Sequence, residues 1–206
     1  MDPRFRGDDR GYDSRPDPVV HETPTQLSMR ALHLSAVLAL AAALGCTRGA
    51  VVQTAPARSS AHADLSDASG QPVGSVTLTQ TPHGVLLTAR LHDLPAGQHA
   101  FHIHAVGECT PPFTSAGGHF NPANRQHGIE NPAGMHAGDM PNITIPESGT
   151  IDFQVLNEMT SLSEGGNRIL DDDGAAVVVH ATADDYMSDP AGNAGARIAC
   201  GVITRG

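Results

Sequence analysis

Short apolar runs separated by turn residues fill the C-terminal two thirds of the sequence. Val76-Thr77-Leu78-Thr79 alternates apolar and polar residues, Val85–Leu91 is mostly apolar, and further runs lie at residues 100–106, 150–155, 175–180 and 197–203. Runs of this length, bounded by Gly, Pro, Asn and Asp, predict β-strands, and none of them continues with the 3.6-residue period of a long helix. We therefore expect an all-β domain, an antiparallel β-sandwich or flattened barrel.

Two long segments interrupt this strand pattern. Residues 107–142 are crowded with Gly, Pro, Asn and His, and residues 181–196 are rich in Gly and Asp. Long loops inside a compact domain are usually functional. We expect both segments to be functional loops carried by the sheet.

The charge balance restricts the partners of the chain. Acidic residues number 22 against 12 basic ones, and every basic residue is an arginine because the sequence has no lysine. This balance argues against nucleic-acid binding. A small anionic substrate would need a locally positive entrance within a negative field.

The N-terminal region predicts export. Residues 29–46 combine an arginine, an apolar stretch of about 15 residues and a small-residue end, as in a signal peptide, and the stretch is short for a membrane span. Cys46 follows Ala43-Leu44-Gly45 and could carry a lipid anchor, whereas cleavage near residues 55–57 would release a soluble protein. Both alternatives predict a periplasmic or membrane-anchored protein that faces the periplasm.

Composition indicates what the remaining segments of the chain are. Residues 1–28 are polar without apolar periodicity and precede the export signal, so we interpret them as a misassigned or disordered extension. Residues 47–61 form a linker of mainly small and polar residues. One folded domain is expected over residues 62–206.

The sequence contains three cysteines: Cys46, Cys109 and Cys200. If Cys46 is lipidated or removed, one pair remains, and in an oxidising compartment such a pair predicts a disulfide. Two separate buried thiols are the alternative.

Six of the twelve histidines fall in three places. His102 and His104 occupy alternate positions of a strand, so both side chains point to one face and can converge on an ion. The first long loop adds His119, His127, His136 and Asp139, and three nitrogens with one oxygen suit a closed, structural zinc site. His180 ends a buried Val-Val-Val strand, and its addition to His102 and His104 makes an all-imidazole set that favours copper.

Several motifs together resemble one known family. They are Gly97-x-His99-x-Phe101-His102-Ile103-His104-x-x-Gly107-x-Cys109, Ala116-Gly117-Gly118-His119-Phe120-Asn121-Pro122, His136-x-Gly138-Asp139 and residues 192–203, Gly-Asn-Ala-Gly-Ala-Arg-Ile-Ala-Cys-Gly-Val-Ile. Their order and spacing are similar to those of the copper,zinc superoxide dismutases, over the whole expected domain. The resemblance implies a Greek-key β-sandwich, an architecture for which this family is a standard example.

The resemblance also implies an activity and a role for each motif residue. The expected reaction is the disproportionation of superoxide to dioxygen and hydrogen peroxide, with one copper and one zinc per subunit. Copper would be held by His102, His104, His119 and His180, and zinc by His119, His127, His136 and Asp139, so that His119 bridges the two ions. Asp184 matches a carboxylate that hydrogen-bonds a copper histidine and a zinc histidine, here His102 and His127, and Cys109 and Cys200 match the family disulfide.

The resemblance assigns His119 and Arg197 the catalytic roles. His119 would pass a proton during turnover, and Arg197 would attract superoxide beside the copper channel. Because the chain lacks lysine, this attraction would depend on Arg197 with help from Arg125.

Some alternatives stay open. The domain could store copper and zinc without turnover, or it could hold zinc alone as a structural unit. A homodimer and a monomer are both compatible with the sequence. His62, His83, His92 and His99 are expected to be ordinary residues.

Overall fold

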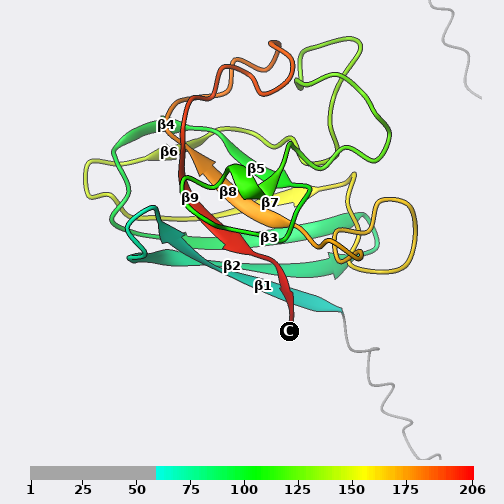
Figure 1. Ribbon diagram of the computed structural model, residues 1–206, viewed down its shortest axis with the longest axis horizontal. Helices are drawn as coiled ribbons and strands as arrows, with labels where there is room; N and C mark the ends of the chain where they lie inside the picture. Colours follow the sequence, from blue (N-terminus) through cyan, green and yellow to red (C-terminus); the bar gives the residue numbers. More distant parts are fainter. Residues whose placement is uncertain (1–58) are drawn as a thin grey trace, which may run out of the picture. The chain divides into compact units, whose positions relative to one another are not determined.

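The computed structural model describes residues 59–206, which form a nearly all-β domain (Figure 1). Its strands are β1 (Ser60–Asp67), β2 (Pro72–Thr81), β3 (Gly84–Leu91), β4 (Gly97–His99), β5 (Phe101–His104), β6 (Ile143–Ile145), β7 (Ile151–Asn157), β8 (Ala176–His180), β9 (Arg197–Val202) and β10 (Thr204–Arg205). A single 3₁₀ turn, η1 (Thr114–Ala116), is the one helical element among these residues. No helix in the described range has the length and hydropathy needed to cross a bilayer.

The main sheet has the strand order β5-β8-β9-β1-β2-β3-β7, with β10 paired to β1. The chain therefore crosses from β3 near one end of the sheet to β5 at the other, returns to β7, and crosses again to β8. The sheet curls on itself (Figure 1), and the short β4–β6 pair forms a separate two-stranded sheet. The expected Greek-key β-sandwich or flattened barrel is confirmed.

The core lies inside the curl. Alternate residues of β2 and β3, such as Val76, Leu78 and Leu87, are fully buried and face the same interior as Phe101 and Ile103 of β5. Every residue of β8 is buried, because Val177 and Val179 face the core while Ala176 and Val178 pack under Phe113 and Ala116 on the other face of the sheet. A buried strand of this kind is rigid, which matters because β5 and β8 both end in histidines.

Local differences from the sequence expectation have physical causes. Strand β1 begins at Ser60, inside the expected linker, and its inward residues Ala61 and Ala63 are small, so their alternation was a weak signal. β5 ends at His104 rather than at residue 106, because the amides of Ala105 and Val106 bond loop carbonyls instead of a strand. The short strands β4, β6 and β10 were not predicted.

Long loops connect the strands at the positions expected for residues 107–142 and 181–196. A third long connection, residues 158–175, was not singled out in the sequence. The extension 1–28, the export segment 29–46 and Cys46 lie outside the described residues.

Candidate metal centre

Four histidines from two adjacent strands and one loop converge at the rim of the barrel. His102 and His104 lie on β5, His180 ends the neighbouring strand β8, and His119 forms an isolated bridge with His104. One ring nitrogen from each of the four lies within 4.8 Å of the others, and all four residues are buried. We call these four residues the imidazole group.

A second group of ligand atoms adjoins the first. His119, His127, His136 and Asp139 also place one atom each within 4.8 Å of one another. The Oδ1 atom of Asp139 lies 2.8 Å from His119 Nδ1, 3.1 Å from His127 Nδ1 and 3.4 Å from His136 Nδ1. We call this set the mixed group, because it offers three nitrogens and one carboxylate.

His119 belongs to both groups. Its Nδ1 faces Asp139, whereas its Nε2 is buried and has no hydrogen-bond partner in residues 59–206. His102 Nδ1 is buried and unpartnered in the same way. Buried polar nitrogens without partners are costly, and each of these two belongs to a residue of the imidazole group, so both fit the role of metal ligands.

Asp184 joins the two groups from the 181–196 loop. Its Oδ2 lies 2.9 Å from His102 Nε2, and its Oδ1 lies 2.9 Å from His127 Nε2. A carboxylate at these nitrogens favours the tautomers that leave both Nδ1 atoms free as ligands. The carbonyl of Gly117 does the same for His104, because it accepts from His104 Nδ1 at 3.1 Å and leaves Nε2 toward His180.

Burial keeps three histidines of the imidazole group neutral. It lowers the pKa of His119 to about 4 and of His180 to about 3, and it lowers the pKa of His104 well below 6.5. Neutral imidazoles are the form that binds metals, so these ligands need not lose a proton near pH 7.

The mixed group behaves differently because it contains a carboxylate. Burial raises the pKa of Asp139, but hydrogen bonds from His119, His127 and His136 outweigh it and hold that pKa well below the usual range. Burial lowers the pKa of His127, but its hydrogen bonds with Asp139 and Asp184 raise it to about 9. The group therefore has an anionic ligand that attracts a cation, and His127 must release a proton to bind a metal near pH 7.

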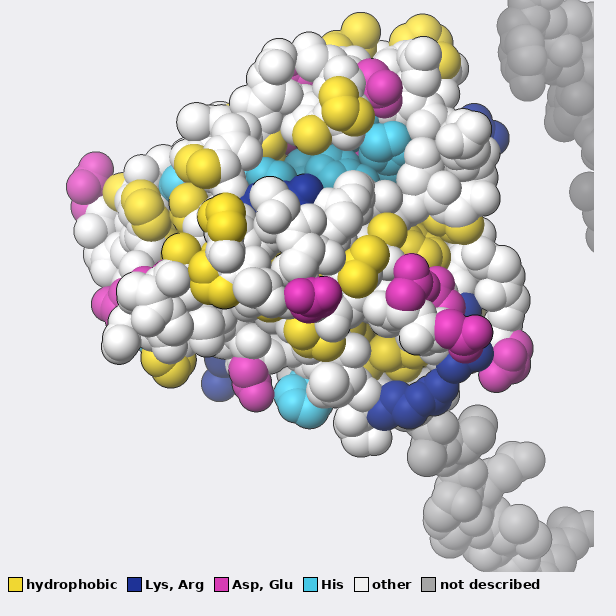
Figure 2. All heavy atoms as spheres, viewed as in Figure 1, with side chains coloured by type: hydrophobic (Ala, Val, Ile, Leu, Met, Phe, Trp, Pro, Cys, Tyr) yellow, Lys and Arg dark blue, Asp and Glu magenta, His cyan; other side chains and the backbone are white. Residues whose placement is uncertain are grey.

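Arg197 begins β9 and lies half-buried near the imidazole group. Its guanidinium donates to the carbonyl oxygens of Phe113 and Gly117, the second at 2.6 Å. Burial lowers its pKa from 12.5, and a guanidinium still carries its charge at neutral pH. Figure 2 shows the histidines gathered in a hollow below the upper loops with a basic side chain at its edge.

The predicted disulfide between Cys109 and Cys200 is present, and the two cysteines are 91 positions apart in the sequence. It ties the loop that carries η1 to strand β9. Arg125, the other expected source of positive charge, is exposed, and its backbone bonds the side chain of Asn121.

Sequence reasoning missed some residues that hold the site. His99 is buried, and its Nδ1 lies 2.8 Å from the backbone oxygen of His180. Asn142 exchanges two hydrogen bonds with the backbone of Asp184, of 2.9 and 2.8 Å. The position of His99 inside the Gly97–Cys109 motif was a signal for its role. The position of Asn142, at the end of the first loop, gave no such signal.

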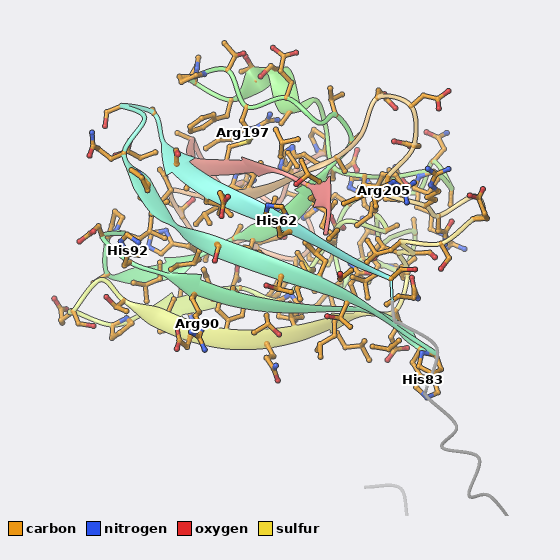
Figure 3. All side chains as sticks on the ribbon, turned by 90° about the horizontal axis from the view of Figure 1, so that it is seen from below. His62, His83, Arg90, His92, Arg197 and Arg205 are labelled. Carbon is orange, nitrogen blue, oxygen red and sulfur yellow. A yellow bond between two sulfur atoms is a disulfide. The ribbon has the colours of Figure 1, made fainter. Side chains whose placement is uncertain are left out.

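The other histidines set aside in the sequence lie elsewhere. His62, His83 and His92 are spread apart along the sheet (Figure 3). The side chains of His62 and His92 are about half exposed, at 50% and 47%. None of the three belongs to either group of ligand atoms.

Comparison with known proteins agrees with this arrangement. Residues 73–203 match the family described as copper/zinc superoxide dismutase. A superoxide dismutase [Cu-Zn] of Aquifex aeolicus is 50% identical over 145 residues, which cover 69% of this chain and 86% of that protein. The superoxide dismutase [Cu-Zn] of Caulobacter vibrioides is 44% identical over 170 residues, covering 81% of this chain and 98% of that protein.

Solved structures show the same likeness. A SOD-like protein from Bacillus subtilis superposes with a TM-score of 0.67 at 40% identity, covering 69% of this chain and 97% of that one. The Cu/Zn superoxide dismutase from Brucella abortus gives a TM-score of 0.59 at 30% identity, covering 70% and 99%. With its sequence motifs, its fold and its paired ligand groups in agreement, the chain belongs to the copper/zinc superoxide dismutase family.

Proposed function

We propose that the chain performs the family reaction with copper bound by the imidazole group and zinc bound by the mixed group. Two superoxide anions and two protons give dioxygen and hydrogen peroxide. The observation that carries this assignment is that His119 belongs to both groups: its Nδ1 faces Asp139, and its buried Nε2 has no hydrogen-bond partner in residues 59–206. Four nitrogens suit copper, and three nitrogens with one carboxylate suit zinc.

Bound copper supplies the one-electron chemistry, and the chain supplies ligands, a proton carrier and a charge. His119 Nε2 is the atom at which the chain can take up a proton and return it, while Nδ1 stays with Asp139. Asp184 and the Gly117 carbonyl hold His102, His127 and His104 in the tautomers that ligation needs. The rigid ends of β5 and β8 keep these rings in place between turnovers.

Arg197 attracts the anionic substrate in this proposal. The overall charge of the chain is −10, so a superoxide ion meets a repulsive field until it nears the hollow. The two carbonyl oxygens that hold the guanidinium keep its charge beside His104 and His180. A storage protein would need neither this fixed charge nor a shared histidine, and a zinc-only domain would not need the imidazole group.

A metal-reconstitution assay tests the proposal. The purified domain is loaded with copper and zinc, and superoxide decay is followed for wild type, His180→Ala and the exposed control His62→Ala. We expect rapid decay with wild type and His62→Ala, and loss of nearly all catalysed decay with His180→Ala because copper loses one of four ligands. Stoichiometric binding of both metals without catalysed decay would favour storage, and binding of zinc alone would favour the structural alternative.

We infer that the protein is exported, because residues 29–46 have the pattern of a signal peptide and a Cys109–Cys200 disulfide is typical of oxidising compartments. We also infer a lipid anchor on Cys46 that holds the domain at the periplasmic side of a membrane. Cell fractionation tests both inferences: the anchor predicts that Cys46→Ser moves the mature protein from the membrane to the soluble periplasmic fraction. Sedimentation of the purified domain decides between the monomer and the homodimer, both of which the sequence allows.

A further inference from the structure

The 181–196 loop contacts the first long loop at several points besides Asp184. The Glu130 amide donates to the Tyr186 carbonyl at 3.1 Å. The Asn131 side chain donates to the carbonyls of His127 at 2.9 Å and Met187 at 3.4 Å. The two loops therefore lie against each other, which brings side chains of the 181–196 loop near the ligands of the mixed group.

Asp189 is one such side chain, and it faces two ligands of the mixed group. Its Oδ1 accepts a 2.6 Å hydrogen bond from the backbone amide of His127. The same oxygen lies 3.9 Å from His136 Nε2. At that distance the second contact is electrostatic, because it is too long for a hydrogen bond.

The orientation of His136 gives this contact a chemical meaning. His136 Nδ1 lies 3.4 Å from both His119 Nδ1 and Asp139 Oδ1, so Nδ1 faces the interior of the mixed group. A histidine that ligates through Nδ1 carries its proton on Nε2, the atom that faces Asp189. A nearby carboxylate favours that tautomer and so helps to orient the ring.

We propose that Asp189 is a positioning residue for the zinc ion: it fixes the backbone at His127 and orients the ring of His136. The inference rests on the proposed binding of zinc by the mixed group. It adds a second carboxylate of the 181–196 loop, besides Asp184, that acts on this group. The two act on different atoms, since Asp184 bonds a ring nitrogen of His127 and Asp189 bonds its backbone amide.

Asp185 offers a matched control in the same loop. It is an exposed aspartate like Asp189, but its carboxylate accepts hydrogen bonds only from its own loop. The donors are Met187 N, Ser188 N and Asn193 Nδ2. Asp185→Ala therefore loosens the 181–196 loop without removing a bond to the mixed group. Asp189→Ala removes both contacts, whereas Asp189→Asn keeps an oxygen for the His127 amide and removes only the charge.

Cobalt(II) binding gives a readout that does not depend on activity. Co²⁺ replaces zinc in tetrahedral sites and absorbs visible light there, so chelator competition yields its affinity for the mixed group. We expect Asp189→Ala to weaken Co²⁺ binding about 10-fold, the lower end of the range for partners of metal ligands, because Asp189 is partly exposed. The Co²⁺ affinity of Asp189→Asn should lie between the affinities of Asp189→Ala and wild type. Asp185→Ala should bind Co²⁺ with the affinity of wild type.

Amide hydrogen exchange at His127 provides the second measurement. Exchange should accelerate in Asp189→Ala and stay near the wild-type rate in Asp189→Asn and Asp185→Ala. Equal Co²⁺ affinity in wild type and Asp189→Ala, or an equal loss in Asp185→Ala, overturns the role of Asp189 and leaves the zinc assignment intact. If wild type itself gives no tetrahedral Co²⁺ spectrum, the zinc assignment is overturned together with this inference.

Discussion

Gly192 shows how closely a single residue limits the metal centre. Its φ of +62° lies in the left-handed region, and a Cβ atom there would lie 1.8 Å from Asp184 Oδ1 and 2.7 Å from His127 Nε2. The carboxylate that joins the two ligand groups therefore occupies the space that any other side chain would need.

We predict that Gly192→Ala displaces Asp184 and weakens metal binding roughly 10-fold to 100-fold, as loss of an outer partner of metal ligands does. The measurement is chelator competition for zinc and copper. Gly166→Ala is the control, because a Cβ atom at Gly166 meets no atom within 4 Å. Unchanged metal affinity in Gly192→Ala would show that Asp184 can move without consequence.

At the scale of elements, the disulfide and Arg197 act on the same pair of segments. Cys200 and Arg197 lie on β9, while Cys109 and the carbonyls that hold Arg197 belong to the loop around η1. The disulfide therefore keeps the loop close enough for its carbonyls to position the guanidinium.

We predict that the double variant Cys109→Ser, Cys200→Ser loses about 4–5 kcal/mol of unfolding free energy, because an open chain of this loop length gains conformational freedom when unfolded. Denaturant unfolding of the metal-free domain measures the change. Reduction of wild type with dithiothreitol should reproduce it. An unchanged midpoint after reduction would contradict the prediction.

Some strands have a clear local sequence pattern and others do not. β3 and β8 carry long apolar runs, so local pattern alone indicates them. β1 alternates alanines with polar residues and becomes a strand because β2 and β9 pair with it. Its boundary depends on those partners, and no local signal marks it.

At the scale of the whole molecule, the charge distribution should govern the approach of superoxide. Asp171 and Asp173 line the same surface hollow as His119. The chain has no lysine to offset them, and Arg197 is half-buried, where salt screens its charge less than that of an exposed residue.

We predict that the double variant Asp171→Asn, Asp173→Asn increases kcat/KM for superoxide at low ionic strength, because it removes two negative charges from a surface pocket that His119 also lines. The gain should shrink as salt rises toward 0.15 M, where the screening length is about 8 Å. Wild type should depend only weakly on salt. Pulse radiolysis over a range of ionic strengths measures both, and a steep fall of wild-type kcat/KM with salt would contradict this picture.

The sequence by itself determined the class of fold, the candidate ligands and the family resemblance, because strand alternation, the His102-x-His104 pair and the motif order are local along the chain. The resemblance also implied how the ligands group and that Asp184 bonds His102 and His127, but only the tertiary structure gives the distances between these atoms and the other contacts that hold them. His102 and His127 meet Asp184 across 82 and 57 residues, and the contacts of His99, Asn142 and Asp189 arise only when separate loops pack together. Such contacts depend on how the curled sheet brings distant segments to one rim, which no spacing along the chain encodes.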